Sequence, residues 1–106
     1  MPKAEPKAEQ APKPQSLVVE DTFIWNSRRS GAEIRIPLDF DWDLMEDFMD
    51  RSEAGENDLA LMRDMLNALV PGGIRGQGLG TYEVQSMFEA WQDAGRKYAG
   101  ASYPES

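Results

Sequence analysis

Residues 81–98, TYEVQSMFEAWQDAGRKY, constrain the fold more than any other stretch of the chain. Apolar residues recur there at three- and four-residue steps, which is the spacing of one helix face. They are Val84, Met87, Phe88, Trp91 and Tyr98. Thr81 can cap the amino end of such a helix. Because an aromatic face cannot stay in water, the pattern predicts a helix over 81–98 that packs against the rest of the chain.

Residues 21–38, further upstream, follow a period of two, which is typical of strands. Phe23 and Trp25 fall on one face of the first strand. One face of the second strand carries Ile34, Ile36 and Leu38. The polar residues 26–31 between the strands end in a glycine, which suits a turn. The pattern predicts a two-stranded antiparallel hairpin over 21–38, and such a hairpin needs helices to cover its apolar face.

Two more amphipathic segments lie between the hairpin and the helix over 81–98. The first covers about 41–53 and can be capped by Asp39 or Asp41. Its apolar stripe consists of Leu44, Met45, Phe48 and Met49. The second covers about 57–70 and ends at the Pro-Gly-Gly sequence that follows. Its buried stripe is expected to consist of Leu59, Met62, Met65, Leu66, Leu69 and Val70.

These patterns together predict an α+β fold, mainly α, in which an N-terminal two-stranded β-hairpin packs on about three short helices. The globular domain is expected to span 17–99. Residues 1–16 are mostly Pro, Lys, Ala, Glu and Gln, and they hold no large apolar side chain after Met1. Nothing there offsets the entropy lost on ordering the segment. We therefore expect 1–16 to form a disordered tail and 100–106 to form a frayed end.

The residue types exclude most catalytic chemistry. The chain has no cysteine and no histidine, which removes thiolate nucleophiles, imidazole bases and the usual zinc ligands. Asp39–Asp43 alternates acids as a calcium loop does, but Leu44 stands where that loop requires glycine. The glycine-rich residues 72–80 follow a predicted helix rather than a strand, so a phosphate-binding loop is not indicated. We predict that the protein is not an enzyme and has no cofactor and no metal site.

Charge and hydropathy narrow the choice of partners. The formal net charge is -8 at pH 7, and this sign repels phosphate backbones and argues against a nucleic-acid partner. No apolar run approaches the roughly 20 residues that span a bilayer, and the first ten residues lack the apolar centre of a signal peptide. The absence of cysteine fits a reducing compartment. We expect a soluble cytoplasmic protein that binds other proteins and no membrane.

Four motifs in order carry a resemblance to a known family: TFIWNS, GAEIRIPLDF, MFEAWQDAG and the ending GASYPES. With two short helices between the second and third motifs, the arrangement resembles the tail assembly chaperones of long-tailed (siphovirus-type) phages of actinobacteria, which also occur in prophages. The resemblance covers roughly 22–106. Its most specific parts are IPLDF at 36–40 and FEAWQ at 88–92.

The resemblance implies a protein that binds the tape measure protein and keeps it soluble until tail tube subunits polymerise around it. It implies action in the host bacterial cytoplasm and absence from the mature virion. In this family a programmed ribosomal frameshift adds a second domain, so this chain would be the short form. The tail tube protein and the frameshifted longer form of the chain itself are then further possible partners.

The adaptable apolar side chains of the predicted helices are the candidate partner contacts. They are Met45, Phe48, Met49, Met87, Phe88 and Trp91. For Trp91, burial in the core is the competing interpretation. A different class of function also fits the acidity of the chain: an acidic inhibitor or DNA mimic that blocks a nucleic-acid-binding protein.

Overall fold

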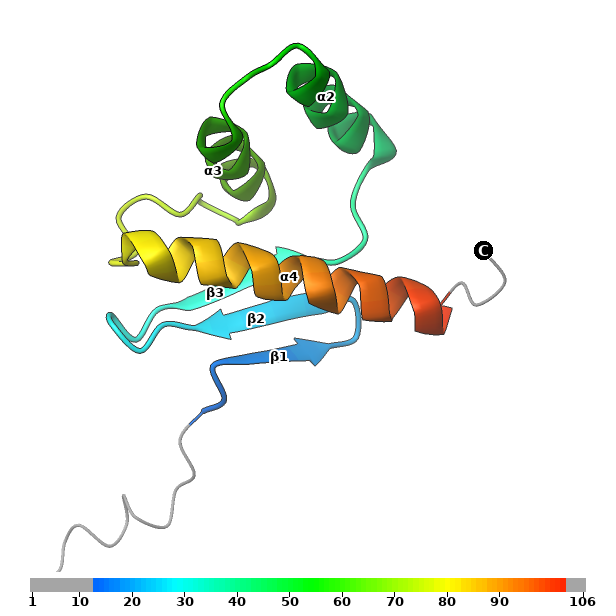
Figure 1. Cartoon of the computed structure of the whole chain (residues 1–106). Helices are drawn as coiled ribbons and strands as arrows, with labels where there is room; N and C mark the ends of the chain where they lie inside the picture. Colours follow the sequence, from blue (N-terminus) through cyan, green and yellow to red (C-terminus); the bar gives the residue numbers. More distant parts are fainter. Residues whose placement is uncertain (1–12, 103–106) are drawn as a thin grey trace, which may run out of the picture.

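The computed structural model describes residues 13–102 and shows an α+β, mainly helical fold (Figure 1). Three strands come first, β1 (Ser16–Val19), β2 (Thr22–Asn26) and β3 (Glu33–Pro37), and they form an antiparallel sheet in the order β1-β2-β3. Three helices follow, α2 (Trp42–Glu53), α3 (Asp58–Leu69) and α4 (Thr81–Ser102). The predicted class and the three helices are therefore confirmed.

The sheet has one strand more than the predicted hairpin. In β1, Leu17 faces Ile24 and Val19 faces Thr22 of β2, so β1 extends the sheet on the side away from β3. The turn between β1 and β2 is Glu20 and Asp21, and Glu20 takes a left-handed φ of 58°. Glycine and asparagine are the residues that usually adopt this conformation. The two-stranded prediction was wrong because the turn lacks the residues that normally mark a hairpin.

The folded domain also begins earlier in the chain than residue 17, where it was predicted to begin. Residues 1–12 of the expected tail lie outside the described residues, but Ser16 belongs to β1. The Asn26 N–H donates to the Gln15 carbonyl at 2.8 Å, and the Gln15 side chain donates back to the Asn26 carbonyl at 3.1 Å. The Asn26 amide group also donates to the Pro14 carbonyl at 2.9 Å. Residues 14–16 are thus held by β2, and the prediction of disorder was wrong for them.

Helix α4 lies along one face of the sheet and completes the core (Figure 1). The sheet face towards α4 carries Phe23, Trp25, Ile34 and Ile36, all almost fully buried, as the predicted alternation requires. Met87 and Trp91 of α4 pack into the same cluster. Ile24 points to the opposite face and is also buried, which the alternation did not indicate. The core is therefore formed mainly between the sheet and one side of α4.

The amino end of α4 is fixed by Glu83 rather than by the predicted cap at Thr81, which is the first helical residue. One Glu83 carboxylate oxygen accepts from the Gly80 N–H at 3.1 Å, and the other accepts from the Trp25 indole N–H at 2.9 Å. Burial alone would raise the pKa of Glu83, but the hydrogen bonds from Trp25, Gly80 and Ser27 outweigh it and lower the pKa. Glu83 thus joins the start of α4 to the central strand.

The carboxyl end of α4 lies beyond the predicted limit at residue 98. The helix continues through Gly95 and Gly100 to Ser102, so the frayed end expected over 100–106 is helical at least as far as residue 102. Residues 103–106 of that prediction lie outside the described part. A glycine inside a helix costs only about 1 kcal/mol relative to alanine, which a long helix tolerates.

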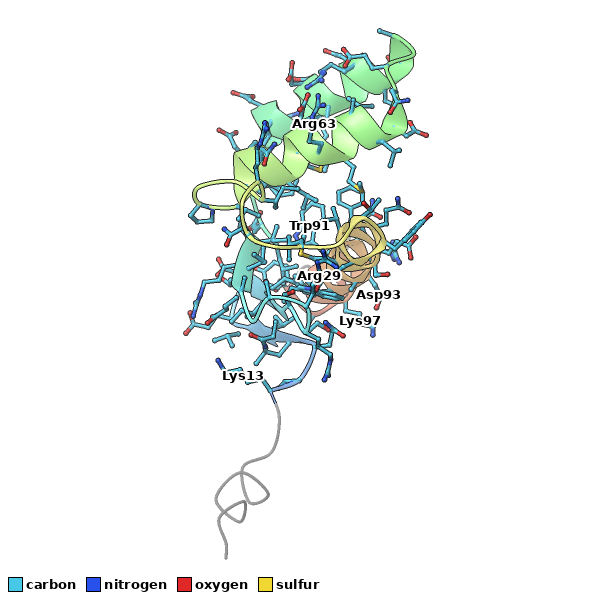
Figure 2. All side chains as sticks on the ribbon, turned by 90° about the vertical axis from the view of Figure 1, so that its left-hand side faces the viewer. Lys13, Arg29, Arg63, Trp91, Asp93 and Lys97 are labelled. Carbon is cyan, nitrogen blue, oxygen red and sulfur yellow. The ribbon has the colours of Figure 1, made fainter. Side chains whose placement is uncertain are left out.

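Helices α2 and α3 form a helical arm, defined here as residues 41–70, which lies across the β3 side of the sheet and of α4 (Figures 1 and 2). Asp41, one of the two candidate caps of α2, accepts from the Asp43 N–H, and Asn57 caps α3 by accepting from the Ala60 N–H. Leu66 and Val70 anchor α3 in the core. Leu59, predicted for the buried stripe, is instead 56% exposed because only the carboxyl half of α3 reaches the body of the domain.

A candidate partner-binding groove

One hollow of the described residues lies where the helical arm faces α4. Its volume is about 430 Å³. Helix α2 contributes Met45, Phe48 and Met49, and α3 contributes Leu61, Met62 and Met65. Phe88 closes it from α4, and the few polar lining groups are Ser52, Asp58 and Gln92. We call this hollow the methionine groove, because four of its lining side chains are methionines.

A second hollow of about 400 Å³ continues the methionine groove towards the carboxyl end of α4. The two share Met45, Met65, Phe88 and Gln92. The second is lined further by Leu38, Phe40 and Trp91, and it ends at Gly95, Arg96 and Ala99 of α4. From Phe88 to Ala99 the helix rises roughly 16 Å at 1.5 Å per residue. The two hollows together therefore follow about three turns of α4.

The predicted partner contacts divide into two groups. Met45, Phe48, Met49 and Phe88 line the methionine groove as a set, although Phe48 is itself only 6% exposed. Met87 has no exposed surface and packs between α4 and the sheet, so it is a core residue and not part of a partner surface. Trp91 borders the second hollow but is only 6% exposed, which places most of its ring in the core.

Sequence reasoning missed half of the groove. Leu61, Met62 and Met65 of α3 line it as fully as the residues of α2 do. The helical spacing of Met62 and Met65 was visible in the sequence but was interpreted as a stripe buried in the core, and Leu61 was not part of that predicted stripe. The three are in fact half-buried, because the arm rests on the body through the end of α3 and leaves its middle open towards α4.

Apolar side chains also extend from the groove onto the outer edge of α2. Met49 is 44% exposed and Trp42 is 61% exposed. Glu46 and Glu53 lie three residues before and four residues after Met49, so they share its side of the helix, and both are exposed. The outer rim of the groove therefore alternates large apolar side chains with carboxylates.

The negative charge of the protein is concentrated in the helical arm. Residues 41–70 hold nine carboxylates and two arginines, a net charge of −7 out of the chain's total of -8. Both arginines are occupied within the arm. Arg51 bridges Glu56 at 2.8 Å and Asp64 at 2.7 Å, and Arg63 pairs with Asp64 at 2.9 Å. The groove is thus built into the most acidic part of the molecule.

One of these ion pairs, between Arg51 of α2 and Asp64 of α3, joins the two helices of the arm. The Arg51 guanidinium also lies over the Phe48 ring, 5.3 Å from its centroid, which is within cation–π range. Hydrogen bonds from Arg63 and Arg51 lower the pKa of Asp64, and the bonds to Glu56 and Asp64 raise that of Arg51. These links hold α2 against α3 and keep Phe48 on the groove side.

Residues 13–102 show no group of three or more histidine, cysteine, aspartate or glutamate side chains that could hold a metal ion. In the same part of the chain, no helix has the length and apolar content needed to cross a membrane. Asp93 and Lys97 of α4 pair with each other at 3.2 Å and point away from the arm (Figure 2).

Comparison with models of known protein families gave no match to this chain, and comparison with curated proteins and with solved structures gave none either.

Proposed function

We propose that the protein is a phage tail assembly chaperone that binds the tape measure protein and keeps it soluble for tail tube polymerisation. The observation that carries the proposal is the methionine groove, an open apolar surface in a small and otherwise strongly charged domain. Methionine side chains adapt to partners of irregular shape, which suits a chaperone whose client is long, helical and prone to aggregate. The tail tube protein and a frameshifted longer form of the chain are proposed as further partners, in the host cytoplasm.

The proposal also fits the absence of visible catalytic chemistry in the sequence. A holding chaperone needs an accessible apolar surface and enough charge to stay soluble while that surface is filled. The acidic arm supplies both, because Met49 and Trp42 are exposed among carboxylates on the same helix. We infer that the arm is the client-binding part and that the sheet with α4 is its support.

The concentration of charge in the arm favours one second candidate, an acidic inhibitor or DNA mimic. Such a protein would use the carboxylates of residues 41–70 to occupy a basic nucleic-acid-binding surface. Its binding would depend on charge and not on the apolar groove. Replacing one exposed groove methionine would therefore leave a mimic active and impair a chaperone.

Co-expression with a tape measure protein tests the proposed function. If a neighbouring gene encodes a very long helical protein, that protein is the client for this test, and the readout is its soluble fraction after lysis. We expect the client to be insoluble alone and soluble with the wild-type protein. Met49→Ser should reduce the soluble fraction, because Met49 lines the groove and is exposed.

Leu59→Ser is the matched control for that experiment. Leu59 is an exposed apolar residue of the same arm that lines neither hollow, so its replacement should leave the client soluble. A client that stays insoluble with the wild-type protein would refute the chaperone proposal. Equal effects of the two substitutions would show that the groove is not the site of client binding.

A further inference from the structure

We propose that the methionine groove binds one amphipathic α-helix whose apolar stripe is flanked by lysine or arginine side chains. The inference deepens the proposed function and rests on it only in taking the client as the natural source of such a helix. It follows from three features of the groove: its shape, its lining and the charge of its rim.

The shape of the groove fits a helix. The two hollows follow roughly 16 Å of α4, and the arm forms the opposite wall. An amphipathic helix places one row of apolar side chains in such a groove at three- and four-residue steps. The groove has no free strand edge along its length, since helices and the segment before α2 provide its lining. A bound β-strand would have no backbone partner there.

The lining selects apolar side chains of varied size. Met45, Met62 and Met65 lie in the interior of the groove, and the polar groups are few. Flexible thioether side chains can rearrange around leucine, isoleucine or phenylalanine of a bound helix. The groove therefore specifies an apolar stripe without specifying one sequence.

The rim selects positive charge on the bound helix. Glu46 and Glu53 flank the exposed Met49, and Asp58 lines the groove from α3. The one described cation that lines either hollow is Arg96, at the far end of the second, and it is paired with Asp93 at 3.3 Å. A helix with lysines beside its apolar stripe would place them against these carboxylates. Acidic flanks would meet like charge and be rejected.

Two model peptides test the inference without requiring the natural client. Each has about 18 residues, enough for roughly five helical turns, with leucines on one stripe. One carries lysines beside the stripe, and the other carries glutamates at the same positions. Binding of fluorescein-labelled peptide to the full-length protein is measured by fluorescence anisotropy. We expect the lysine peptide to bind and the glutamate peptide to bind at least about tenfold more weakly.

Substitutions in the protein then locate the binding site. Met49→Ser should weaken binding of the lysine peptide about tenfold, since most of one large apolar contact is lost. Leu59→Ser should change the affinity for the same peptide less than about twofold. Glu46→Gln should weaken it about threefold at low salt, and that difference should shrink in high salt. Glu33→Gln, on the sheet face away from α4, is the control for an equal change of charge.

The outcomes separate the two proposals. Equal affinity for both peptides, or equal effects of the Met49 and Leu59 substitutions, would overturn the inference while client solubility in co-expression still supported the chaperone. Selective lysine-peptide binding that depends on Met49, together with an insoluble client, would support the groove inference and refute the proposed function. Circular dichroism of each variant excludes unfolding as the cause.

Discussion

Replacing Trp91 tests whether this side chain of α4 is part of the core or part of a partner-binding surface. Trp91 is 6% exposed, and its ring contacts Phe40 and Phe88 at centroid distances of 5.8 and 5.5 Å. Its indole N–H donates to the Pro37 carbonyl at 2.9 Å. The Trp91 side chain therefore joins α4, the end of β3 and the segment that leads to the arm.

The expected cost of Trp91→Ala follows from these contacts. Deleting a buried tryptophan costs about 3–5 kcal/mol through lost transfer free energy and the cavity that remains. Small domains have a total stability of about 5–15 kcal/mol. If the stability of this domain is near 5 kcal/mol, the Trp91→Ala variant should be mostly unfolded at 37 °C. Trp91→Phe keeps much of the ring but loses the donor to the Pro37 carbonyl. It should cost about 1–3 kcal/mol.

Thermal unfolding followed by far-ultraviolet circular dichroism measures both effects. A loss of 1 kcal/mol lowers the Tm of a domain of this size by about 4–8 °C, so the 1–3 kcal/mol expected for Trp91→Phe should lower the Tm by roughly 4–24 °C. Trp42→Ala is the control, because Trp42 is 61% exposed on the surface of α2. It should leave the Tm within a few degrees of wild type.

The burial argument would be refuted by a Trp91→Ala protein with the wild-type Tm. If that protein also failed to keep the client soluble, Trp91 would belong to the partner surface. If it remained fully active, both interpretations of Trp91 would be wrong. A variant that is unfolded and inactive is the expected result, with the loss of activity following from the loss of structure.

Three further predictions concern the body of the domain. Glu83→Gln should lower the free energy of unfolding by about 1 kcal/mol at pH 7. Because folding lowers the pKa of Glu83, this stabilisation is fully present above the unfolded-state pKa near 4.5 and is lost as the pH falls through the folded-state pKa. Urea titrations of wild type and variant should therefore converge in acid. Gly78→Ala should lower the free energy of unfolding by roughly 1–3 kcal/mol, because φ is +76° and the new Cβ would lie 2.7 Å from a serine Cβ of the β2–β3 hairpin. Gly76→Ala is the control, with φ +83° and nothing within 4 Å of the new Cβ, and it should lower the stability less. Equal Tm values for the two variants would contradict this. Deleting residues 1–16 should lower the Tm more than deleting 1–12, because the longer deletion also removes the hydrogen bonds between Gln15 and Asn26 of β2. Identical melting curves would show that these bonds do not stabilise the domain.

The elements that sequence periodicity could identify are those in which local pattern and tertiary burial agree. In β2 and β3, Phe23, Trp25, Ile34 and Ile36 alternate in sequence and are all buried on one face. The caps at Asp41 and Asn57 depend only on neighbouring residues, and both were predictable. Strand β1 has four residues and a turn without glycine or asparagine, so its existence depends on pairing with β2, which no local pattern reports.

The candidate site was predictable only in part, because an apolar stripe in the sequence does not indicate which other residues pack against it. Met49 and Leu66 both lie on such stripes, yet one is 44% exposed and the other is fully buried. The difference arises from the position of the arm, which touches the body through the carboxyl end of α3. That position depends on contacts between residues far apart in the chain, including Leu66 and Val70 with the sheet.

The two hydrogen bonds that fix α4 to the sheet also bear on how the domain folds. Trp25 and Glu83 are 58 residues apart, and Pro37 and Trp91 are 54 residues apart. The hairpins of the sheet and the helical pair of the arm close much shorter loops, and short loops close at lower entropic cost. We therefore expect the sheet and the arm to form early, with the docking of α4 as the slow step. During synthesis on the ribosome, the chain would leave Phe23, Ile34 and Ile36 without cover until α4 has emerged.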